Sequence, residues 1–218
     1  MKNILITGGT GNLGQTVVKT LSDHGYHLHL AVRSDVADNA ENVSYYPTDI
    51  ADNEQAERLL AKIVSENVTV NAGVFLAGGF EPGKLAETSM DDISRMISIN
   101  FATAFTVAQK LIAHYKTAGG GKLIFVGAKA AMNPQTAASS LAYSLSKQLL
   151  YNFSELINES EKSAGTTSHI LLPGIIDTTA NRKAMPEADF SKWISPADMA
   201  ATIGEIIAGN ETRAVIEF

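Results

Sequence analysis

The stretch Asn3-Ile4-Leu5-Ile6-Thr7-Gly8-Gly9-Thr10-Gly11-Asn12-Leu13-Gly14 opens the chain and decides its fold. A short apolar run that ends in glycines is typical of a buried parallel strand. A helical pattern follows at Val17, Val18 and Leu21. Glycines between a strand and a helix let the backbone approach a pyrophosphate, to which the helix N-terminus offers free N–H groups. The stretch therefore predicts a dinucleotide-binding turn, against the alternative of a plain tight turn. Its expected cofactor-binding residues are Gly8, Thr10, Gly11, Asn12, Leu13 and Gly14.

The composition excludes several classes of protein. A formal net charge of −6 leaves no basic stripe of the kind that nucleic-acid binding needs. The 218 residues fit a single domain, 1–218. The absence of cysteine excludes disulfides and thiolate metal sites. No signal peptide and no apolar run of membrane-spanning length is evident, so no membrane partner and a cytoplasmic location are expected. The five histidines are scattered, so we expect them to be structural and predict no metal site.

The end of the second predicted strand, residues 27–32, bears on the choice of cofactor. Arg33 follows this strand directly. At this position a carboxylate bonds the ribose hydroxyls of NAD, whereas an arginine suits the 2′-phosphate of NADP. Arg33 therefore favours NADP(H) over NAD(H), although it could merely cap a solvated strand end. The polar segment 35–42 predicts a loop in place of the usual crossover helix.

The third strand is predicted over residues 43–46. Asp49 and Ile50 follow it and are expected to meet the adenine. Asp49 could equally cap the next helix, predicted over residues 53–64.

The fourth strand is predicted over residues 74–76. Asn71 and the two residues after it resemble a nucleotide-site signature but precede this apolar run. Because ligands bind beyond the carboxyl ends of parallel strands, we expect the backbone of Ala77, Gly78, Gly79 and Phe80 to line the cofactor. Asn71 is then structural.

Tyr143 and Lys147 are four residues apart in a predicted helix, so they project from one face. An ammonium close to a phenol favours the phenolate, so we expect the Tyr143 pKa to fall from about 10 toward neutrality. Such a phenol can exchange a proton with a carbonyl or alcohol oxygen. Asn100 lies inside the apolar stripe of a long helix, residues 91–115. It is either a satisfied core amide or a residue that holds water behind Lys147.

The rest of the chain continues the alternation of strands and helices. Further strands are predicted at residues 122–126, 169–172 and 214–218, a lid at 179–195 and a last helix at 197–207. This order predicts one doubly wound α/β domain of Rossmann type, with a mainly parallel sheet flanked by helices.

The order of the motifs resembles the short-chain dehydrogenase/reductase family over essentially the whole chain. The motifs are the glycine turn, Asn100, Tyr143 with Lys147, and Pro173-Gly174 followed by Thr178. The resemblance implies an NAD(P)-dependent oxidoreductase in which Tyr143 is the acid/base. It further implies that Lys147 lowers the Tyr143 pKa and holds the nicotinamide ribose. Asn100 would anchor a water relay, and Pro173, Gly174 and Thr178 would contact the cofactor. The long helices 91–115 and 143–161 would form a homodimer or homotetramer.

A closer resemblance is to the dihydropteridine reductases, through residues 76–80, 127–131 and 177–190. Like them, the chain reads Gly127-Ala128-Lys129-Ala130-Ala131 in the region where most of the wider family carries a serine. Ser139 and Ser140 are candidate substitutes. The chain departs from the animal pteridine enzymes in having Arg33, where they carry Asp, and in having Asn100.

These features favour an NADPH-dependent reductase of a small carbonyl, imine or quinonoid substrate, dihydropterins included. The alternative is a non-catalytic NADP(H)-binding sensor or regulatory protein. A nucleotide-sugar epimerase would use the same Tyr143 and Lys147, but too few residues follow Pro173 for its usual substrate domain.

Overall fold

One parallel sheet organises the protein. The computed structural model describes residues 1–34, 36, 41–65 and 68–218. Seven strands lie in the order β3-β2-β1-β4-β5-β6-β7. They are β1 Asn3–Thr7, β2 His27–Val32, β3 Val43–Pro47, β4 Val70–Phe75, β5 Gly121–Val126, β6 Thr166–Leu172 and β7 Val215–Glu217. The chain starts in the middle of the sheet and winds outward to each edge in turn, which confirms the predicted doubly wound α/β fold.

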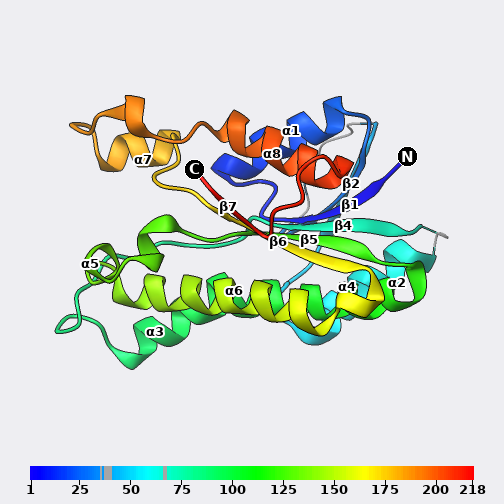
Figure 1. Ribbon diagram of the computed structural model, residues 1–218, viewed down its shortest axis with the longest axis horizontal. Coiled ribbons are helices and arrows are strands. Elements are labelled where there is room, and N and C mark those ends of the chain that lie inside the picture. Colours follow the sequence, from blue (N-terminus) through cyan, green and yellow to red (C-terminus); the bar gives the residue numbers. More distant parts are fainter. Residues whose placement is uncertain (35, 37–40, 66–67) are drawn as a thin grey trace.

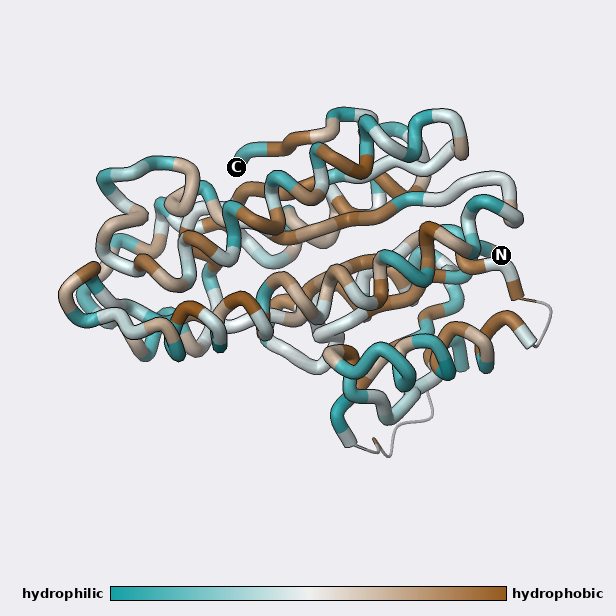
Figure 2. The backbone as a smooth tube through the Cα atoms, turned by 90° about the horizontal axis from the view of Figure 1, so that it is seen from below, coloured by the Kyte–Doolittle hydropathy of each residue, from teal (hydrophilic) through white to brown (hydrophobic). Residues whose placement is uncertain are grey.

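Helices cover both faces of this sheet (Figure 1). On one face lie α1 Asn12–Asp23 and α8 Pro196–Ala208, and on the other α2 Asn53–Ser65, α4 Thr103–Ala118 and α6 Leu141–Ser160. The alternation of side chains along β1 serves both layers, because Ile4 and Ile6 pack toward α1 and α8 whereas Leu5 packs toward α4 and α6. Figure 2 shows the hydrophobic residues concentrated along the central strands and the adjoining helix stretches.

The sheet register brings four loops to one edge. Thr7 pairs with Phe75, Phe75 with Phe125, and Val126 with Leu171. Because all of these strands are parallel, the segments that follow β1, β4, β5 and β6 leave the sheet side by side. This carboxyl edge is where open α/β sheets bind their ligands.

The bounds of β4 differ from the prediction. The strand begins at Val70 and ends at Phe75, so Asn71 lies inside its amino end. The Asn71 Oδ1 atom accepts a hydrogen bond of 2.9 Å from the backbone N–H of Asn3. Asn71 is therefore structural, as expected, but the apolar run alone placed the strand too late. The glycine within it is explained by packing, because a Cβ on Gly73 would lie 2.5 Å from the Leu111 side chain.

The predicted helix 91–115 is a longer run of three parts. It consists of α3 Met90–Ile97, a π-helical turn Ser98–Ala102 and α4. Ser89 caps α3 in a capping box with Asp92. By length and composition Met90–Ala118 could cross a membrane, contrary to the expectation that no run is long enough. Its apolar stripe, which includes Val107, Leu111 and Tyr115, packs in the core, and 33% of the span is buried.

The histidines that we examined for metal binding make structural contacts. The rings of His27 and His29 stack at 4.8 Å. His29 also hydrogen-bonds the Tyr46 hydroxyl at 3.0 Å and Asn3 Oδ1 at 3.3 Å. Burial, and then the neighbouring His27, lower the His29 pKa to about 4. Within the described parts of the chain, no group of three or more metal-binding side chains comes together.

Of the loop predicted over residues 35–42, residues 35 and 37–40 lie outside the described residues. The predicted lid contains α7 Thr179–Ala184 and a short 3-10 turn, Phe190–Lys192. Two further 3-10 turns, Lys129–Met132 and Lys162–Ala164, and the short helix α5 Pro134–Ala137 complete the described elements.

Candidate active site

The glycine turn after β1 packs directly against the segment after β4. Gly8 has φ of +72°, and a Cβ there would lie 2.4 Å from the backbone nitrogen of Ala77. The backbone N–H of Gly11 donates to the Gly8 carbonyl at 3.0 Å, which closes the turn. A Cβ on Gly14 would lie 2.1 Å from that same carbonyl oxygen. These close approaches leave room only for glycine and hold the two segments together at the carboxyl edge.

The N-terminus of α1 is open to an anion. Gly11 is its N-cap, and among the described residues no side chain caps this end. The first turn carries no acidic residue. Gly11 and Asn12 are exposed, whereas Leu13 is half-buried against the core. The free N–H groups and the helix dipole therefore face outward, as a pyrophosphate site requires.

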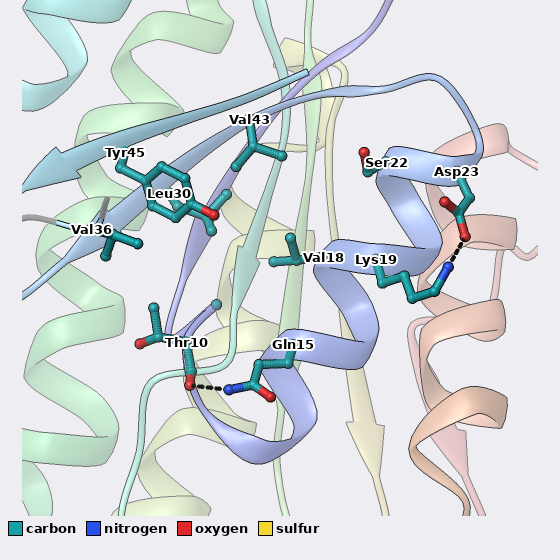
Figure 3. Close-up of a pocket in the computed structure, with 11 residues that line it drawn as sticks. Thr10, Gln15, Val18, Lys19, Ser22, Asp23, Leu30, Val36, Val43 and Tyr45 are labelled. Atoms are coloured by element: carbon teal, nitrogen blue, oxygen red, sulfur yellow. Dashed lines mark hydrogen bonds and ion pairs between the residues drawn. The ribbon is translucent and has the colours of Figure 1, made fainter. Parts of the chain in front are cut away.

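A cavity of about 420 Å³ adjoins this turn along the flank of α1 (Figure 3). Its apolar wall comes from Val18, Leu30, Val43 and Tyr45, and its polar rim from residues that include Thr10, Gln15, Lys19 and Asp23. The amide of Gln15 donates to the Thr10 carbonyl at 3.2 Å, and Lys19 pairs with Asp23 at 2.6 Å. Since neither Tyr143 nor Lys147 lines it, the cavity extends the glycine turn rather than the catalytic centre.

Two further predicted cofactor positions flank the turn. Arg33 is exposed immediately after β2. Asp49 is also exposed, and its Oδ1 accepts a hydrogen bond of 3.0 Å from the Ala51 N–H. Asp52, not Asp49, receives the Gln55 N–H at the start of α2, so the alternative of Asp49 as helix cap is wrong. Ile50 is half-buried and packs against the core.

Lys147 reaches from α6 toward the loops at the carboxyl edge. Its buried Nζ donates to the carbonyl of Val126, the last residue of β5, at 2.8 Å. A Cβ on Gly78 would lie 3.6 Å from the same Nζ. Tyr143 is half-buried one helical turn away, with its ring centroid 5.9 Å from Nζ. The structure thus brings the two predicted catalytic side chains to the segment that contacts the glycine turn.

The expected fall in the Tyr143 pKa is contradicted. Burial raises the Tyr143 pKa to about 12 and lowers the Lys147 pKa to about 8. Both shifts follow from desolvation, which disfavours the charged form of each group. The Lys147 ammonium donates to the Val126 carbonyl, and its attraction does not offset the burial of the phenol. Sequence spacing indicated the proximity of the two groups but not the loss of solvent around them.

Asn100 lies in the π-helical turn and clamps the segment after β4. Its Oδ1 accepts from the Gly79 N–H at 3.0 Å, and its Nδ2 donates to the Gly79 carbonyl at 3.0 Å. Nδ2 also donates to Ser146 Oγ at 3.1 Å. The amide is 1% exposed and satisfied by protein groups, which supports the alternative of a satisfied core asparagine. Through these contacts it orders Gly78 and Gly79.

The two candidate substitutes for the missing serine are engaged elsewhere. Ser139 Oγ donates to the Thr136 carbonyl at 2.8 Å. Ser140 is buried, and its hydroxyl lies 3.3 Å from that of Ser144. Ala128, after β5, is buried and carries no hydroxyl. In this arrangement both serine hydroxyls already have hydrogen-bond partners within the protein.

The segment after β6 completes the edge. Pro173 is buried and its carbonyl accepts from the Lys129 N–H at 2.9 Å, while Gly174 is exposed. Thr178 caps α7, where its hydroxyl accepts from the Asn181 N–H at 3.2 Å. Pro173, Gly174 and Thr178 therefore all follow the carboxyl end of β6, and their contact with a cofactor stays a prediction.

Sequence reasoning missed three contributors to this site. They are the Val126 carbonyl, the Ser146 hydroxyl and the Phe80 side chain, whose ring lies 5.0 Å from that of Tyr143. Ser146 is next to Lys147, and Phe80 is the last residue of the predicted cofactor segment, so position was an available signal for both side chains. Nothing in the sequence distinguishes the Val126 carbonyl from its neighbours.

Comparison with protein families matches residues 2–189 to the family described as short chain dehydrogenase. The dihydropteridine reductase of Dictyostelium discoideum is 28% identical over 218 residues, which cover 97% of this chain and 90% of that protein. The 2,3-dihydro-2,3-dihydroxybenzoate dehydrogenase of Bacillus subtilis strain 168 is 24% identical over 186 residues, or 81% of this chain and 70% of the relative.

Solved structures show the same fold. ElxO with NADP bound has a TM-score of 0.89 and 22% identity, over 99% of this chain and 96% of ElxO. The ligand-free aldohexose dehydrogenase of Thermoplasma acidophilum has a TM-score of 0.85 and 18% identity, over 99% of this chain and 91% of that chain.

Proposed function

Because the chain belongs to the short chain dehydrogenase family of oxidoreductases, we propose that it is an NADPH-dependent reductase. The substrate would be a small carbonyl, imine or quinonoid compound, dihydropterins included. The observation that carries the proposal is the position of Lys147 beside Gly78 and of Tyr143 beside Phe80, in a segment that packs on the glycine turn. A proton donor and a dinucleotide site then share one edge of the sheet.

The residues present fit a dinucleotide. The open N-terminus of α1 suits a pyrophosphate, and the close packing of Gly8 and Gly14 lets the backbone reach it. Gly11, Asn12 and Leu13 would offer their N–H groups, Asp49 and Ile50 would meet the adenine, and the segment from Ala77 to Gly79 would lie along the nucleotide. Lys147 would hold the nicotinamide ribose, with Pro173, Gly174 and Thr178 on the far side.

Arg33 supports the choice of NADP(H). Its guanidinium is exposed where a 2′-phosphate would lie, and it suits bidentate contact with phosphate oxygens. Thr10 is exposed on the neighbouring turn and offers a further hydroxyl. ElxO, which shares the fold, has NADP bound.

The reaction divides between the cofactor and this chain. A bound NADPH supplies the hydride. Tyr143 remains protonated at neutral pH, because its pKa of about 12 lies far above it, and so can give a proton to the substrate oxygen or nitrogen. Lys147 would then stabilise the phenolate that remains. Asn100 holds Gly79, and thereby the wall of the site, in place.

The test is Tyr143→Phe, which removes only the phenolic oxygen. We expect NADPH oxidation to fall about 10²–10⁴-fold, the range for loss of a general acid. The NADPH dissociation constant, followed by cofactor fluorescence, should change less than about twofold. Tyr151→Phe on the same helix is the matched control and should keep its activity. Undiminished turnover in the Tyr143 variant would remove this residue from the mechanism.

One observation favours a second candidate, a non-catalytic NADP(H) sensor. Ala128 lacks the serine hydroxyl of most family members, and the hydroxyls of Ser139 and Ser140 are engaged. A sensor would bind NADPH tightly but would not use it to reduce a carbonyl, a quinone or a dihydropterin. A turnover screen of the wild-type protein against these three classes separates the two candidates.

A homodimer is the assembly we propose. On α6 the side chains of Leu145, Leu149 and Leu156 are 37%, 41% and 66% exposed, and they follow one another at helical spacing. Phe105 of α4 is 38% exposed and packs 5.3 Å from Phe153. Such a contiguous apolar face is typical of an interface. Light scattering should give twice the chain mass for wild type and the monomer mass for Leu156→Glu, and a monomeric wild type would refute the dimer.

A further inference from the structure

Phe80 exposes an aromatic ring beside the proposed proton donor. Its side chain is 67% exposed. Its ring centroid lies 5.0 Å from that of Tyr143, with the ring planes at 72°. This edge-to-face contact has the geometry that aromatic pairs prefer, and it engages only part of the Phe80 ring. A single exposed apolar side chain needs no explanation in itself. Whether Phe80 has a role therefore depends on how firmly the backbone on either side of it is held.

The backbone before Phe80 is fixed. Gly79 exchanges two hydrogen bonds of 3.0 Å with the buried amide of Asn100. The backbone after Phe80 is fixed as well, because the Gly83 N–H donates to the Ser139 carbonyl at 3.0 Å. The Glu81 carboxylate also receives Arg95 Nη2 at 2.6 and 2.7 Å. The exposed ring therefore projects from a backbone held on both sides, rather than from a loose loop tip.

The same contacts couple Phe80 to the helix that carries Tyr143. The Leu141 N–H, at the start of α6, donates to the Gly83 carbonyl at 2.9 Å. Gly78, two residues before Phe80, lies against Lys147. Phe80 and Tyr143 are thus held in fixed relation by bonds at both ends of the segment. A rigid aromatic binds a ligand with little loss of conformational entropy.

We propose that Phe80 is a specificity-determining residue whose ring stacks on a planar, conjugated ring of the substrate next to Tyr143. This inference rests on the proposed reductase function and narrows its substrate class to quinonoid and pterin-like rings rather than saturated carbonyl compounds. The flat face of such a ring can stack offset on Phe80, whereas a puckered saturated ring cannot. The flanking charges of Glu81, Lys84 and Glu87 argue against a broad apolar docking surface at this place.

The direct test uses pterin, the oxidised planar ring, as a fluorescent probe. It is titrated with NADP⁺-saturated wild-type protein and with Phe80→Ala, Phe80→Tyr and Leu85→Ala. Loss of the stacking partner should weaken pterin binding about tenfold in Phe80→Ala. Phe80→Tyr keeps the ring and should bind within about twofold of wild type. Leu85 is 78% exposed in the same segment, and its variant should bind as wild type does.

A second readout separates specificity from general damage. In Phe80→Ala, kcat/KM should fall about tenfold more for 1,4-benzoquinone than for cyclohexanone, and the NADPH dissociation constant should change less than about twofold. Equal losses with both substrates, or equal pterin binding by wild type and Phe80→Ala, would overturn the inference. So would a wild-type protein that binds no pterin at millimolar concentration.

The two proposals can fail separately. If pterin binding depends on Phe80 but no substrate is reduced, the reductase function is wrong and the stacking site stands. If reduction proceeds equally well with and without the Phe80 ring, the function stands and the stacking site is wrong.

Discussion

Substituting Gly8 with alanine tests the central packing of the proposed cofactor site. Two costs act together at this position. The φ of +72° is disfavoured for any residue with a Cβ, and the added Cβ would lie 2.4 Å from the Ala77 nitrogen, a backbone atom that cannot rotate away. A left-handed conformation costs about 1–2 kcal/mol, and overpacking of a well-packed site about 1–3 kcal/mol. We therefore expect Gly8→Ala to lower the free energy of unfolding by about 2–5 kcal/mol.

Two other glycines separate these costs. Gly25 has φ of +76° but nothing within 4 Å of an added Cβ, so Gly25→Ala carries only the conformational cost, about 1–2 kcal/mol. Gly11 has φ of −76°, and an added Cβ would meet only the Gly8 carbonyl at 3.3 Å. Because an alanine adopts this φ without strain, Gly11→Ala should cost about 1 kcal/mol or less.

Urea unfolding of the three variants, followed by circular dichroism, is the assay. In a thermal scan each kcal/mol should lower Tm by about 2–4 °C for a chain of this size. The reasoning requires Gly8→Ala to be the least stable of the three by a clear margin. If Gly8→Ala and Gly25→Ala unfold at the same urea concentration, the contact with Ala77 contributes nothing and the packing argument is wrong.

Three further predictions concern the clamp, the buried histidine and the cofactor. Asn100→Ala leaves the Gly79 N–H and C=O without their Asn100 partners. It should lower the free energy of unfolding, measured in urea, by about 2–4 kcal/mol. A loss under about 0.5 kcal/mol would contradict the role of Asn100 as a clamp. The folded-state pKa of His29, about 4, lies below its unfolded value of 6.5. Between these two values the folded protein binds fewer protons than the unfolded chain, so the free energy of unfolding should fall as pH drops from 6.5 toward 4. In His29→Gln, which can still bond the Tyr46 hydroxyl, this pH slope should be shallower, and an identical slope would exclude His29 as its source. Arg33→Asp should lower the ratio of kcat/KM for NADPH to kcat/KM for NADH about 10–100-fold, because a charge-assisted contact with the 2′-phosphate is lost. An unaltered ratio would refute the assignment of NADP(H).

The sequence was sufficient for the fold because each of its signals is local. The apolar run from Ile4 to Ile6, the glycines after it and the helical spacing at Val17 and Leu21 all concern neighbouring residues. The ends of the strands are local signals as well. Because β1 and β4 are parallel, their ends place Gly8 and Ala77 at the same edge of the sheet. The start of β4 was misplaced because its first residues include an amide and a glycine, which look like a loop until the packing against Leu111 is seen.

The details of the site depend on contacts between distant segments, which a sequence does not reveal. Asn100 could be read as a core amide or as a water-holding residue, and the choice depends on bonds to Gly79 and Ser146. The π-helical turn around Asn100 has no signature in the sequence that we identified. The sequence predicted a place beside the cofactor for the backbone of Phe80, and only the exposure of its ring beside Tyr143 suggests a role for the side chain. Burial likewise decided the Tyr143 pKa against the spacing argument.

The raised Tyr143 pKa and the lowered Lys147 pKa both bear on the proposed proton transfer. A phenol with a pKa of about 12 is fully protonated at neutral pH and is a donor rather than a base. Lys147, with a pKa of about 8, stays mostly charged at pH 7 and so can stabilise the phenolate left by proton transfer. Above pH 8 the ammonium is lost, and with it the stabilisation of that phenolate.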